Sequence, residues 1–527
     1  MQKRYGIVRS SAQHGIQGVM VDIEVAISPG LPGFELVGLA DPAIKESRNR
    51  VQAAIRSSGC TFPNSRITAS LAPAWLRKQG SAFDLPLALA ILIASGQVPN
   101  PAELLTAFGE LTLDGRIRGV PGAISRYAAI HESGSQLCML PSGNRREVEA
   151  IADDKVVFVS SLAELVALLN GNHATRVYAK QPETNGCTKE QEPATDLNHA
   201  KAGADISSIV GQEHAIRAIE IAAAGQHNLL LLGSPGSGKT ALVNTIMSLL
   251  PPLNSEESLE LTRIYSVAGL LGENSGLITK RPFRAPHHSI SKAAMLGGGS
   301  TPRPGEVSLA HHGVLFLDEM TEFEPAVLDN LRQPLEEKLI RVSRSQYTVL
   351  WPASFLLVGA ANPCRCGNYL DDRKRCSCDD YQVKQHLSRL SGPLLDRVDL
   401  FATMTRLDAE SLNRTVTKDK RPAHTSVELA ARIAVCRQFQ LERCCRQGLK
   451  PRLNGLHCSD TLADDFLIPP VVLRKAATAA ESLQLTVRGY QKILRVARTI
   501  ADLAGEEKIG MSHLGEALQF RMMIGDN

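Results

Sequence analysis

A complete phosphate-binding loop lies between an apolar segment and a helix-forming segment, and it constrains the fold more than any other feature. The loop consists of Gly233, Ser234, Pro235, Gly236, Ser237, Gly238, Lys239 and Thr240, in the pattern G-x-x-x-x-G-K-T. Residues 228–232 (NLLLL) are typical of a buried parallel strand, and residues 241–243 favour a helix start. Backbone N–H groups of such a loop surround a β-phosphate at a helix N-terminus. We therefore expect an ATP site in which Lys239 reaches the β- and γ-phosphates and Thr240 binds Mg²⁺.

Length and composition indicate a multidomain protein without membrane contact. The chain has 527 residues, which predicts about two to four domains. Its net charge of +4 neither requires nor excludes a polyanionic partner, because charge can concentrate in a channel. The N-terminus has no signal-peptide pattern, and the longest apolar run, near residues 85–94, is too short to span a bilayer. We expect a cytoplasmic protein.

Periodicity divides the chain into three folded regions joined by two polar segments. Strand-like and helix-like runs alternate in residues 1–170 and predict an α/β domain, with strands at 19–27 and 156–160 and helices at 41–57, 84–94 and 162–169. Residues 171–204 are polar and aperiodic, which predicts a linker. An ATPase core is expected at 205–407, a connector at 408–424 and a helical region at 425–527.

Two further buried strands end in polar residues that suit ATP hydrolysis. Residues 313–317 (GVLFL) are followed by Asp318, which can hold Mg²⁺ with Thr240, and by Glu319, which can polarise the attacking water. Residues 355–361 (FLLVGAA) are followed by Asn362, whose amide can hold that water or sense the γ-phosphate. The order of these motifs resembles that of the AAA+ ATPases.

The resemblance narrows to the ComM/YifB family within the magnesium-chelatase-like AAA+ group, and it covers nearly the whole chain. The segments that carry it are 209–212 (IVGQ, similar to the adenine-contacting segment), 281–288 (RPFRAPHH), 297–299 (GGG), 304–311 (PGEVSLAH), 391–399 (SGPLLDRVD) and 494–502 (LRVARTIAD). It implies an α/β multidomain fold, with a Lon-protease-like N-terminal domain, an AAA+ parallel-sheet core and a C-terminal helical lid.

The resemblance also assigns two arginines. Arg397 matches the arginine finger, which would reach the γ-phosphate held by a neighbouring subunit, and Arg488 matches the second sensor arginine. Arg389 and Arg495 are rivals that spacing leaves open. A finger supplied by a neighbour requires a closed ring, and the family implies a homohexamer.

Four of the 11 cysteines gather in two C-x-C pairs, Cys364 with Cys366 and Cys376 with Cys378. Four thiolates can close a tetrahedral Zn²⁺ shell of the structural kind, and the alternative is free thiols. Because the cluster follows Asn362 closely, it could brace the surface beside the nucleotide or face a partner.

Residues 109–122 (GELTLDGRIRGVPG) resemble a segment of the Lon proteolytic domain, which suggests a Ser–Lys protease. No lysine occurs between Lys78 and Lys155, and Ile124 stands about where the Lon lysine would fall. We therefore expect the fold without the protease chemistry.

The preferred substrate is DNA, single-stranded or branched. Residues 337–349 predict a hairpin that resembles the channel-facing hairpin of minichromosome maintenance helicases, with Arg344 near its tip. The candidate DNA contacts are Arg344, Lys338, Arg341 and Lys292, with Arg281 and Arg284 as weaker ones. The family implies a helicase that promotes branch migration in homologous recombination during natural transformation. A protein-remodelling ATPase and a chelatase-type motor for Mg²⁺ insertion into a tetrapyrrole are the alternatives, in that order.

Overall fold

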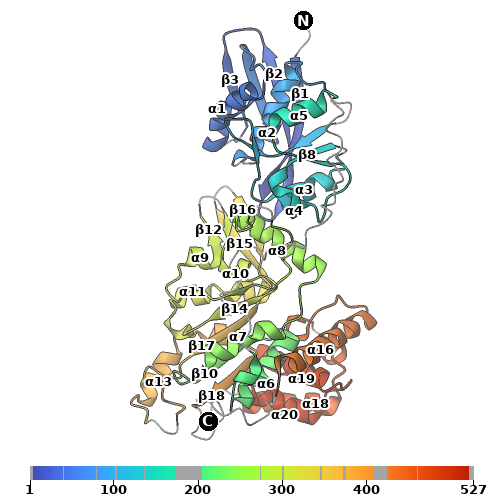
Figure 1. The fold of residues 1–527 in the computed structure, drawn as a ribbon. Coiled ribbons are helices and arrows are strands. Elements are labelled where there is room, and N and C mark those ends of the chain that lie inside the picture. The colour runs from blue at the N-terminus through green and yellow to red at the C-terminus, as the bar shows by residue number, and fades with distance from the viewer. Residues whose placement is uncertain are drawn as a thin grey trace. The chain divides into compact units, whose positions relative to one another are not determined.

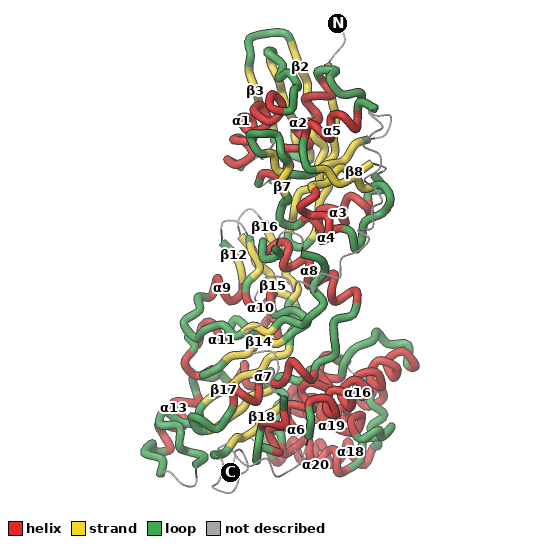
Figure 2. Tube along the Cα trace, viewed as in Figure 1, coloured by secondary structure: helices red, strands yellow, loops and turns green. Residues whose placement is uncertain are grey.

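The computed structural model describes residues 4–521 except for 39–40, 77, 79, 101–103, 136, 172–204, 273–274, 300–301, 345–346, 372–374, 407–423 and 460 (Figures 1 and 2). The chain divides into two compact units. The first contains the N-terminal region to residue 195, together with Ser255–Ile278 and Ser343–Leu350, and the second contains the remainder. The predicted linker and connector lie almost entirely outside the described residues. Among the described helices, none has the length and apolar character that crossing a bilayer requires.

The first unit is built on a seven-stranded sheet in the order β3-β4-β2-β1-β5-β8-β9. The strands are β1 (Arg4–His14), β2 (Gln17–Ser28), β3 (Gly33–Val37), β4 (Arg66–Ala72), β5 (Leu105–Ala107), β8 (Leu137–Pro141) and β9 (Val156–Val159). β2 pairs antiparallel with both β1 and β4, whereas β1, β5, β8 and β9 run parallel. Buried residues alternate along β2, as its predicted strand pattern requires.

Three helices in the first unit form where the periodicity predicts them: α1 (Pro42–Ser57), α2 (Asp84–Ala94) and α5 (Leu162–Leu169). Two more, α3 (Ala123–Glu132) and α4 (Arg145–Val148), lie outside the helices predicted from the sequence. The side chain of Asp41 accepts a hydrogen bond from the Ile44 backbone N–H and so caps α1. Every residue of α2 is buried, which explains why its sequence is apolar throughout after Asp84.

The Lon-like segment forms the small hairpin β6 (Glu110–Leu111) and β7 (Ile117–Arg118) and then enters α3. Gly122 caps α3 in the left-handed region, with a φ of 75°. Ile124 is fully buried in the first turn of α3, so an apolar core residue occupies the position considered for a catalytic lysine. Lys78 is also buried, and its ammonium donates to the carbonyl of Pro73.

The helix α8 (Ser255–Ala268) follows α7 (Lys239–Leu249) in sequence, yet it belongs to the first unit. The Gly122 N–H donates to the Ser266 carbonyl at 3.2 Å and to its hydroxyl at 2.9 Å. The same hydroxyl donates to the buried Glu147 carboxylate, which also accepts the Ile124 N–H at 3.0 Å. These bonds attach α8 to α3 within the first unit.

The second unit contains a five-stranded sheet in the order β11-β14-β17-β10-β18, and every neighbouring pair is parallel. The strands are β11 (Phe283–Arg284), β14 (Val314–Leu317), β17 (Leu356–Ala361), β10 (Leu229–Gly233) and β18 (Leu400–Met404). The central strands β10, β14 and β17 are buried throughout, as their apolar runs predict. The helix α6 (Glu213–Gly225) contacts β18 and α7 (Lys239–Leu249).

C-terminal helices form the lid of the second unit (Figure 1). They are α16 (Ser426–Arg446), α17 (Leu462–Asp465), α18 (Pro470–Ser482), α19 (Val487–Leu503) and α20 (Met511–Gln519). α19 contacts α6, α16, α18 and α20. At its centre the fully buried Arg498 pairs with Asp502, which also binds Arg443 at 2.6 Å. This buried network connects α16 to α19, and it accounts for the arginine and aspartate in the segment 494–502.

Short elements lie between the sheet strands along the chain, and two of them, β15 (Leu339–Arg344) and β16 (Tyr347–Pro352), form the predicted hairpin, which the structure confirms. The others are α9 (Lys292–Leu296), β12 (Gly297–Gly298), β13 (Arg303–Pro304), α10 (Glu306–Leu309), α11 (Pro325–Asp329), α12 (Arg332–Glu337), α13 (Asp380–Leu387) and α14 (Gly392–Leu395). The fold class predicted from the sequence is therefore confirmed: two α/β regions, with a parallel-sheet core and a helical lid.

Candidate active site

The phosphate-binding loop joins β10 to α7, as its sequence predicts. Gly236 and Gly238 adopt left-handed conformations with φ values of 79° and 92°. No atom lies within 4 Å of the position that a Cβ of Gly236 would take, so the loop is open on that side. At Gly233 a Cβ would lie 2.5 Å from the Met404 carbonyl, because β18 runs directly beside the loop.

The Lys239 ammonium is held inside this loop by three acceptors. It donates to the Gly233 carbonyl at 2.7 Å, to the Ser234 carbonyl at 3.1 Å and to the Asn362 side-chain oxygen at 3.1 Å. Burial lowers the pKa of Lys239, and the charges of Asp318 and Glu319 oppose that shift. The predicted residues Lys239 and Asn362 therefore meet at the carboxyl edge of the sheet.

Asp318 follows β14 at the same edge. Its carboxylate accepts the Thr240 hydroxyl at 2.8 Å and the Glu319 N–H at 3.0 Å. Glu319 is exposed and has a φ of 48°, so the chain turns sharply and separates its side chain from that of Asp318. The structure thus brings together the residues predicted for Mg²⁺ and for water activation.

Polar atoms of the loop that lack hydrogen-bond partners also suit a bound nucleotide. The buried hydroxyls of Ser234 and Ser237 have no hydrogen-bond partner among the described residues. Together with the left-handed glycines they make a polar cradle of the kind that phosphate oxygens fill. Thr240 and Asp318 would hold Mg²⁺, which supplies charge neutralisation at the phosphates. In the predicted adenine-contacting segment, Gln212 is buried and donates to the Thr405 carbonyl at 2.7 Å.

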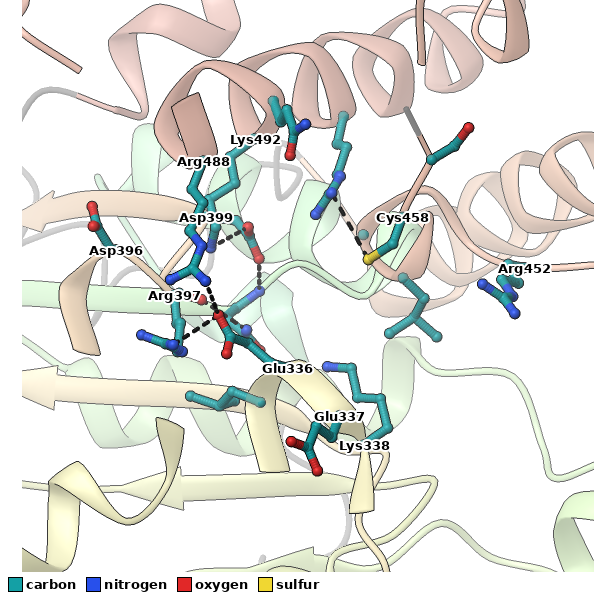
Figure 3. Close-up of a pocket in the computed structure, with 17 residues that line it drawn as sticks. Glu336, Glu337, Lys338, Asp396, Arg397, Asp399, Arg452, Cys458, Arg488 and Lys492 are labelled. Carbon is teal, nitrogen blue, oxygen red and sulfur yellow. Dashed lines mark hydrogen bonds and ion pairs between the residues drawn. The ribbon is translucent and has the colours of Figure 1, made fainter. Parts of the chain in front are cut away.

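A second polar cavity, of about 800 Å³, lies at the amino edge of the same sheet (Figure 3). We call it the arginine pocket, and it is lined by Asn228, Leu335, Glu336, Glu337, Lys338, Asp396, Arg397, Asp399, Arg452, Gly455, Leu456, Cys458, Ser459, Arg488, Gln491, Lys492 and Arg495. Asn228 precedes β10 and Asp399 precedes β18. The pocket is therefore separated from the phosphate-binding loop by the length of β10, about 15 Å.

Arg397 and Arg488 meet in this pocket at one carboxylate (Figure 3). The Glu336 Oε1 atom lies 2.7 Å from Arg397 and 3.0 Å from Arg488. The Arg397 side chain is only 8% exposed, its Nη1 donates to the Pro393 carbonyl, and its Nε has no partner among the described residues. In contrast, the Arg488 side chain is 58% exposed. Neither arginine lies beside the phosphate-binding loop of its own subunit.

The two rival arginines occupy different places. Arg495 lines the arginine pocket, with a guanidinium nitrogen 3.9 Å from the Cys458 sulfur. Arg389 is outside that pocket and pairs with Glu322 at 3.4 Å. At the base of the pocket Lys492 pairs with Asp399 at 2.8 Å, and burial lowers the pKa of this lysine to about 8. Arg397, Arg488 and Arg495 therefore converge, and Arg389 does not join them.

The four clustered cysteines gather as the C-x-C pairs predict. The sulfur of Cys364 lies 3.4 Å from that of Cys366 and 3.7 Å from that of Cys376, and Cys366 and Cys376 are 3.5 Å apart. The sulfur of Cys378 completes the cluster, because all four sulfurs lie within 4.8 Å of one another. Zinc–sulfur bonds of about 2.3 Å place tetrahedral thiolates about 3.8 Å apart, so the cluster fits Zn²⁺. A backbone hydrogen bond from Asn368 lowers the pKa of the Cys366 thiol to about 5, which favours the thiolate.

The candidate DNA contacts fall into three groups. Arg341 on β15 and Lys292 at the start of α9 are exposed. Lys338 lies at the foot of the hairpin and lines the arginine pocket instead of reaching the tip. Placement of the Arg344 side chain lies outside the described residues.

The two weaker candidates are held by internal partners, which changes their interpretation. Arg284 makes a two-pronged pair with Glu306, with both distances at 2.7 Å. Arg281 donates to the backbone carbonyls of Pro251 and His312. Both guanidiniums brace the sheet edge, so neither is retained as a DNA contact.

Sequence reasoning missed Glu336 and the pair formed by Lys492 and Asp399. Nothing in the local pattern marks Glu336, which sits among several acids near the end of α12. Its role follows only from the approach of α14, β18 and α19 to the same edge of the sheet.

Comparisons with known proteins identify the family of the chain. Family models described as magnesium chelatase, subunit ChlI, match residues 205–412, and further ChlI models match residues 23–144 and 423–521. The chain is 41% identical to competence protein ComM of Haemophilus influenzae, with 98% of this chain and 97% of that protein covered. It is 39% identical to YifB of Escherichia coli, covering 98% and 96%. Lon protease 2 of Bacillus subtilis is 25% identical over 46% of this chain and 47% of its own.

Proposed function

Because this chain belongs to the ComM/YifB family of magnesium-chelatase-like AAA+ ATPases, we propose that it forms a homohexameric ring that couples ATP hydrolysis to movement on DNA. The observation that supports the ring is the separation of the two functional clusters. Lys239, Asp318 and Asn362 lie at the carboxyl edge of the sheet, whereas Arg397 and Arg488 lie at its amino edge. A subunit with this layout carries two half-sites on opposite edges.

Neighbouring subunits would complete each other's sites. In a ring, the amino edge of one sheet would face the phosphate-binding loop of the next subunit. Arg397 and Arg488 would then leave Glu336 and bind the γ-phosphate of the neighbour. Guanidinium groups suit this task because they stay charged and bind phosphate oxygens in a fixed fork. An arginine finger contributes roughly 10³- to 10⁵-fold to turnover in related phosphoryl-transfer enzymes.

At the nucleotide site, each residue would have a separate task in hydrolysis. Lys239 would exchange its carbonyl partners for the β- and γ-phosphate oxygens, and the Ser234 and Ser237 hydroxyls would gain acceptors. Glu319 would accept a proton from the attacking water. Asn362 would hold that water in line with the phosphorus, and its present bond to Lys239 keeps the amide at the correct edge.

The DNA substrate is supported by the hairpin and the exposed cations. β15 and β16 form a two-stranded hairpin that begins directly after Lys338, a lining residue of the arginine pocket. Arg341 and Lys292 are exposed to solvent. Such cations bind phosphates without regard to sequence, and salt weakens that binding. The relative named competence protein ComM motivates the narrower proposal, which is branch migration in homologous recombination during natural transformation.

For the cysteine cluster we propose a structural Zn²⁺. Four cysteine ligands leave no open coordination position, so the ion would shape the loop without taking part in chemistry. Sulfur separations of 3.4–3.7 Å are consistent with one shared ion.

One experiment tests the motor proposal. Single-stranded DNA should raise the ATPase rate, and a labelled three- or four-way junction should be resolved in the presence of ATP. Casein incubated with the same protein should stay intact, because Ile124 replaces the protease lysine. If ATPase turnover does not respond to DNA at any salt concentration, the DNA motor is rejected. A protein-remodelling ATPase and then a chelatase-type motor are the functions to test in that case.

A further inference from the structure

The cysteine cluster touches the phosphate-binding loop. Gly367 follows Cys366 directly and lies against Pro235, the third residue of the loop. A Cβ at Gly367 would lie 2.4 Å from Pro235 Cδ and 2.7 Å from its Cγ. Contacts this short are not tolerated, so only glycine permits the two loops to approach so closely. Gly367 also has a φ of 78°, which favours glycine independently.

A polar bridge joins the same two loops a few residues further on. The Asp371 side chain is 2% exposed and lies 3.2 Å from Arg406 Nε. The other end of that guanidinium donates to the Pro235 carbonyl at 3.5 Å. Pro235 is therefore linked to residues that follow the first cysteine pair in two ways: its ring contacts Gly367, and its carbonyl accepts from Arg406, which pairs with Asp371.

We propose that a thiolate-bound metal ion at Cys364, Cys366, Cys376 and Cys378 positions the phosphate-binding loop and thereby sets the affinity for nucleotide. Binding of Zn²⁺ would fix the backbone from Cys364 to Gly367, since two of the four ligands flank that turn. Gly367 then limits the movement of Pro235, and the loop keeps its phosphate-binding shape. The proposal concerns nucleotide binding alone and does not depend on DNA as the substrate.

The metal arm uses the full-length protein and the fluorescent nucleotide mant-ADP in excess Mg²⁺. A zinc-selective chelator should remove about one ion per chain and weaken mant-ADP binding about tenfold, and re-addition of Zn²⁺ should restore the affinity. Linkage requires the reverse effect as well, so saturating ADP should raise the affinity for Zn²⁺ by the same factor. Competition with a chromophoric chelator measures that affinity without any turnover.

A second set of measurements keeps the metal bound and changes the contact between Gly367 and Pro235. Gly367→Ala should retain one Zn²⁺ by elemental analysis and still weaken mant-ADP binding about tenfold. The matched control is Gly505→Ala, because Gly505 has a similar φ of 74° and open space around it. In a Pro235→Ala background the Gly367→Ala substitution should cost much less, because the ring atoms that clash are gone. A general folding defect would not show this suppression.

Three results would overturn the proposal, and the first two concern the affinity for mant-ADP. One is a metal-free protein that binds mant-ADP as tightly as the zinc-loaded protein, and the other is a zinc-loaded Gly367→Ala variant with unchanged affinity. A purified protein that neither contains nor binds Zn²⁺ also rejects it. Failure of DNA to stimulate the ATPase would reject the motor instead and would leave these affinities as they are.

Discussion

The Arg397 guanidinium lies 2.7 Å from the Glu336 carboxylate, and the same carboxylate oxygen is 3.0 Å from Arg488. One acid therefore neutralises both the arginine predicted as the finger, Arg397, and the arginine predicted as the second sensor, Arg488. Glu336 lies three residues before β15, so the loss of its ion pairs would affect the first residues of the hairpin. In the proposed ring, a γ-phosphate would compete with this carboxylate for the two arginines.

Substitution of Glu336 by Gln should shift that competition toward the γ-phosphate. The side chain of Glu336 is 40% exposed, so each ion pair is worth about 0.5–1 kcal/mol. We expect the KM for ATP of the assembled ring to fall about two- to fivefold. Glu337→Gln is the matched control, because this neighbouring carboxylate accepts from Gln333 at 2.9 Å. An unchanged or higher KM in Glu336→Gln would contradict the competition.

Mixing two inactive variants tests whether Arg397 acts on a neighbour. Lys239→Ala and Arg397→Ala should each lose nearly all ATPase activity. Random mixing in equal amounts gives rings in which about a quarter of the interfaces are complete, so activity should recover to about that fraction. The double variant, mixed with either single one, should give none. Mixed rings that form, as mass spectrometry would reveal, but stay inactive would exclude a finger in trans.

Salt dependence tests the hairpin as a DNA contact. Arg341→Ala and Lys292→Ala should each weaken binding of single-stranded DNA. Each should also reduce the slope of log K against log salt by about 0.7, the value for one lost phosphate contact. Arg474→Ala, an exposed arginine of α18 in the lid, serves as the control. If all three variants have the same slope as the unaltered protein, the contacts lie elsewhere.

Stability should depend on pH through His227, which is fully buried two residues before β10. Burial lowers the pKa of His227 from 6.5 to about 4, and its Nε2 lies 2.7 Å from the Thr499 hydroxyl. The unfolded chain then binds the extra proton first as the pH falls. This contribution is therefore present above pH 6.5 and is lost progressively down to about pH 4, by roughly 3 kcal/mol.

Urea titrations of the unaltered protein and of His227→Gln measure that loss. Gln can keep a hydrogen bond to Thr499 but does not titrate in this range. The free energy of unfolding of the variant should fall less steeply between pH 6.5 and 4. Equal slopes would show that His227 does not carry the effect.

Local sequence patterns predicted several elements of each unit. The run 84–94 became α2 with the same bounds, and the apolar segments before the phosphate loop, Asp318 and Asn362 became β10, β14 and β17. These predictions succeed because buried strands and helices reveal themselves by apolar periodicity, which needs no knowledge of distant residues. The meeting of Lys239 with Asn362 also followed, since carboxyl ends of parallel strands share one edge.

Sequence alone therefore determined the fold class, the nucleotide cradle and the cysteine pairs, because each depends on residues close together in the chain or on strand order. Only the tertiary structure decided that Glu336 holds Arg397 and Arg488, that Gly367 abuts Pro235, and that α8 belongs to the first unit. Each of these rests on side chains or segments from separate elements that fold into contact. No periodicity or spacing in the sequence around these residues indicates which distant residue each one contacts.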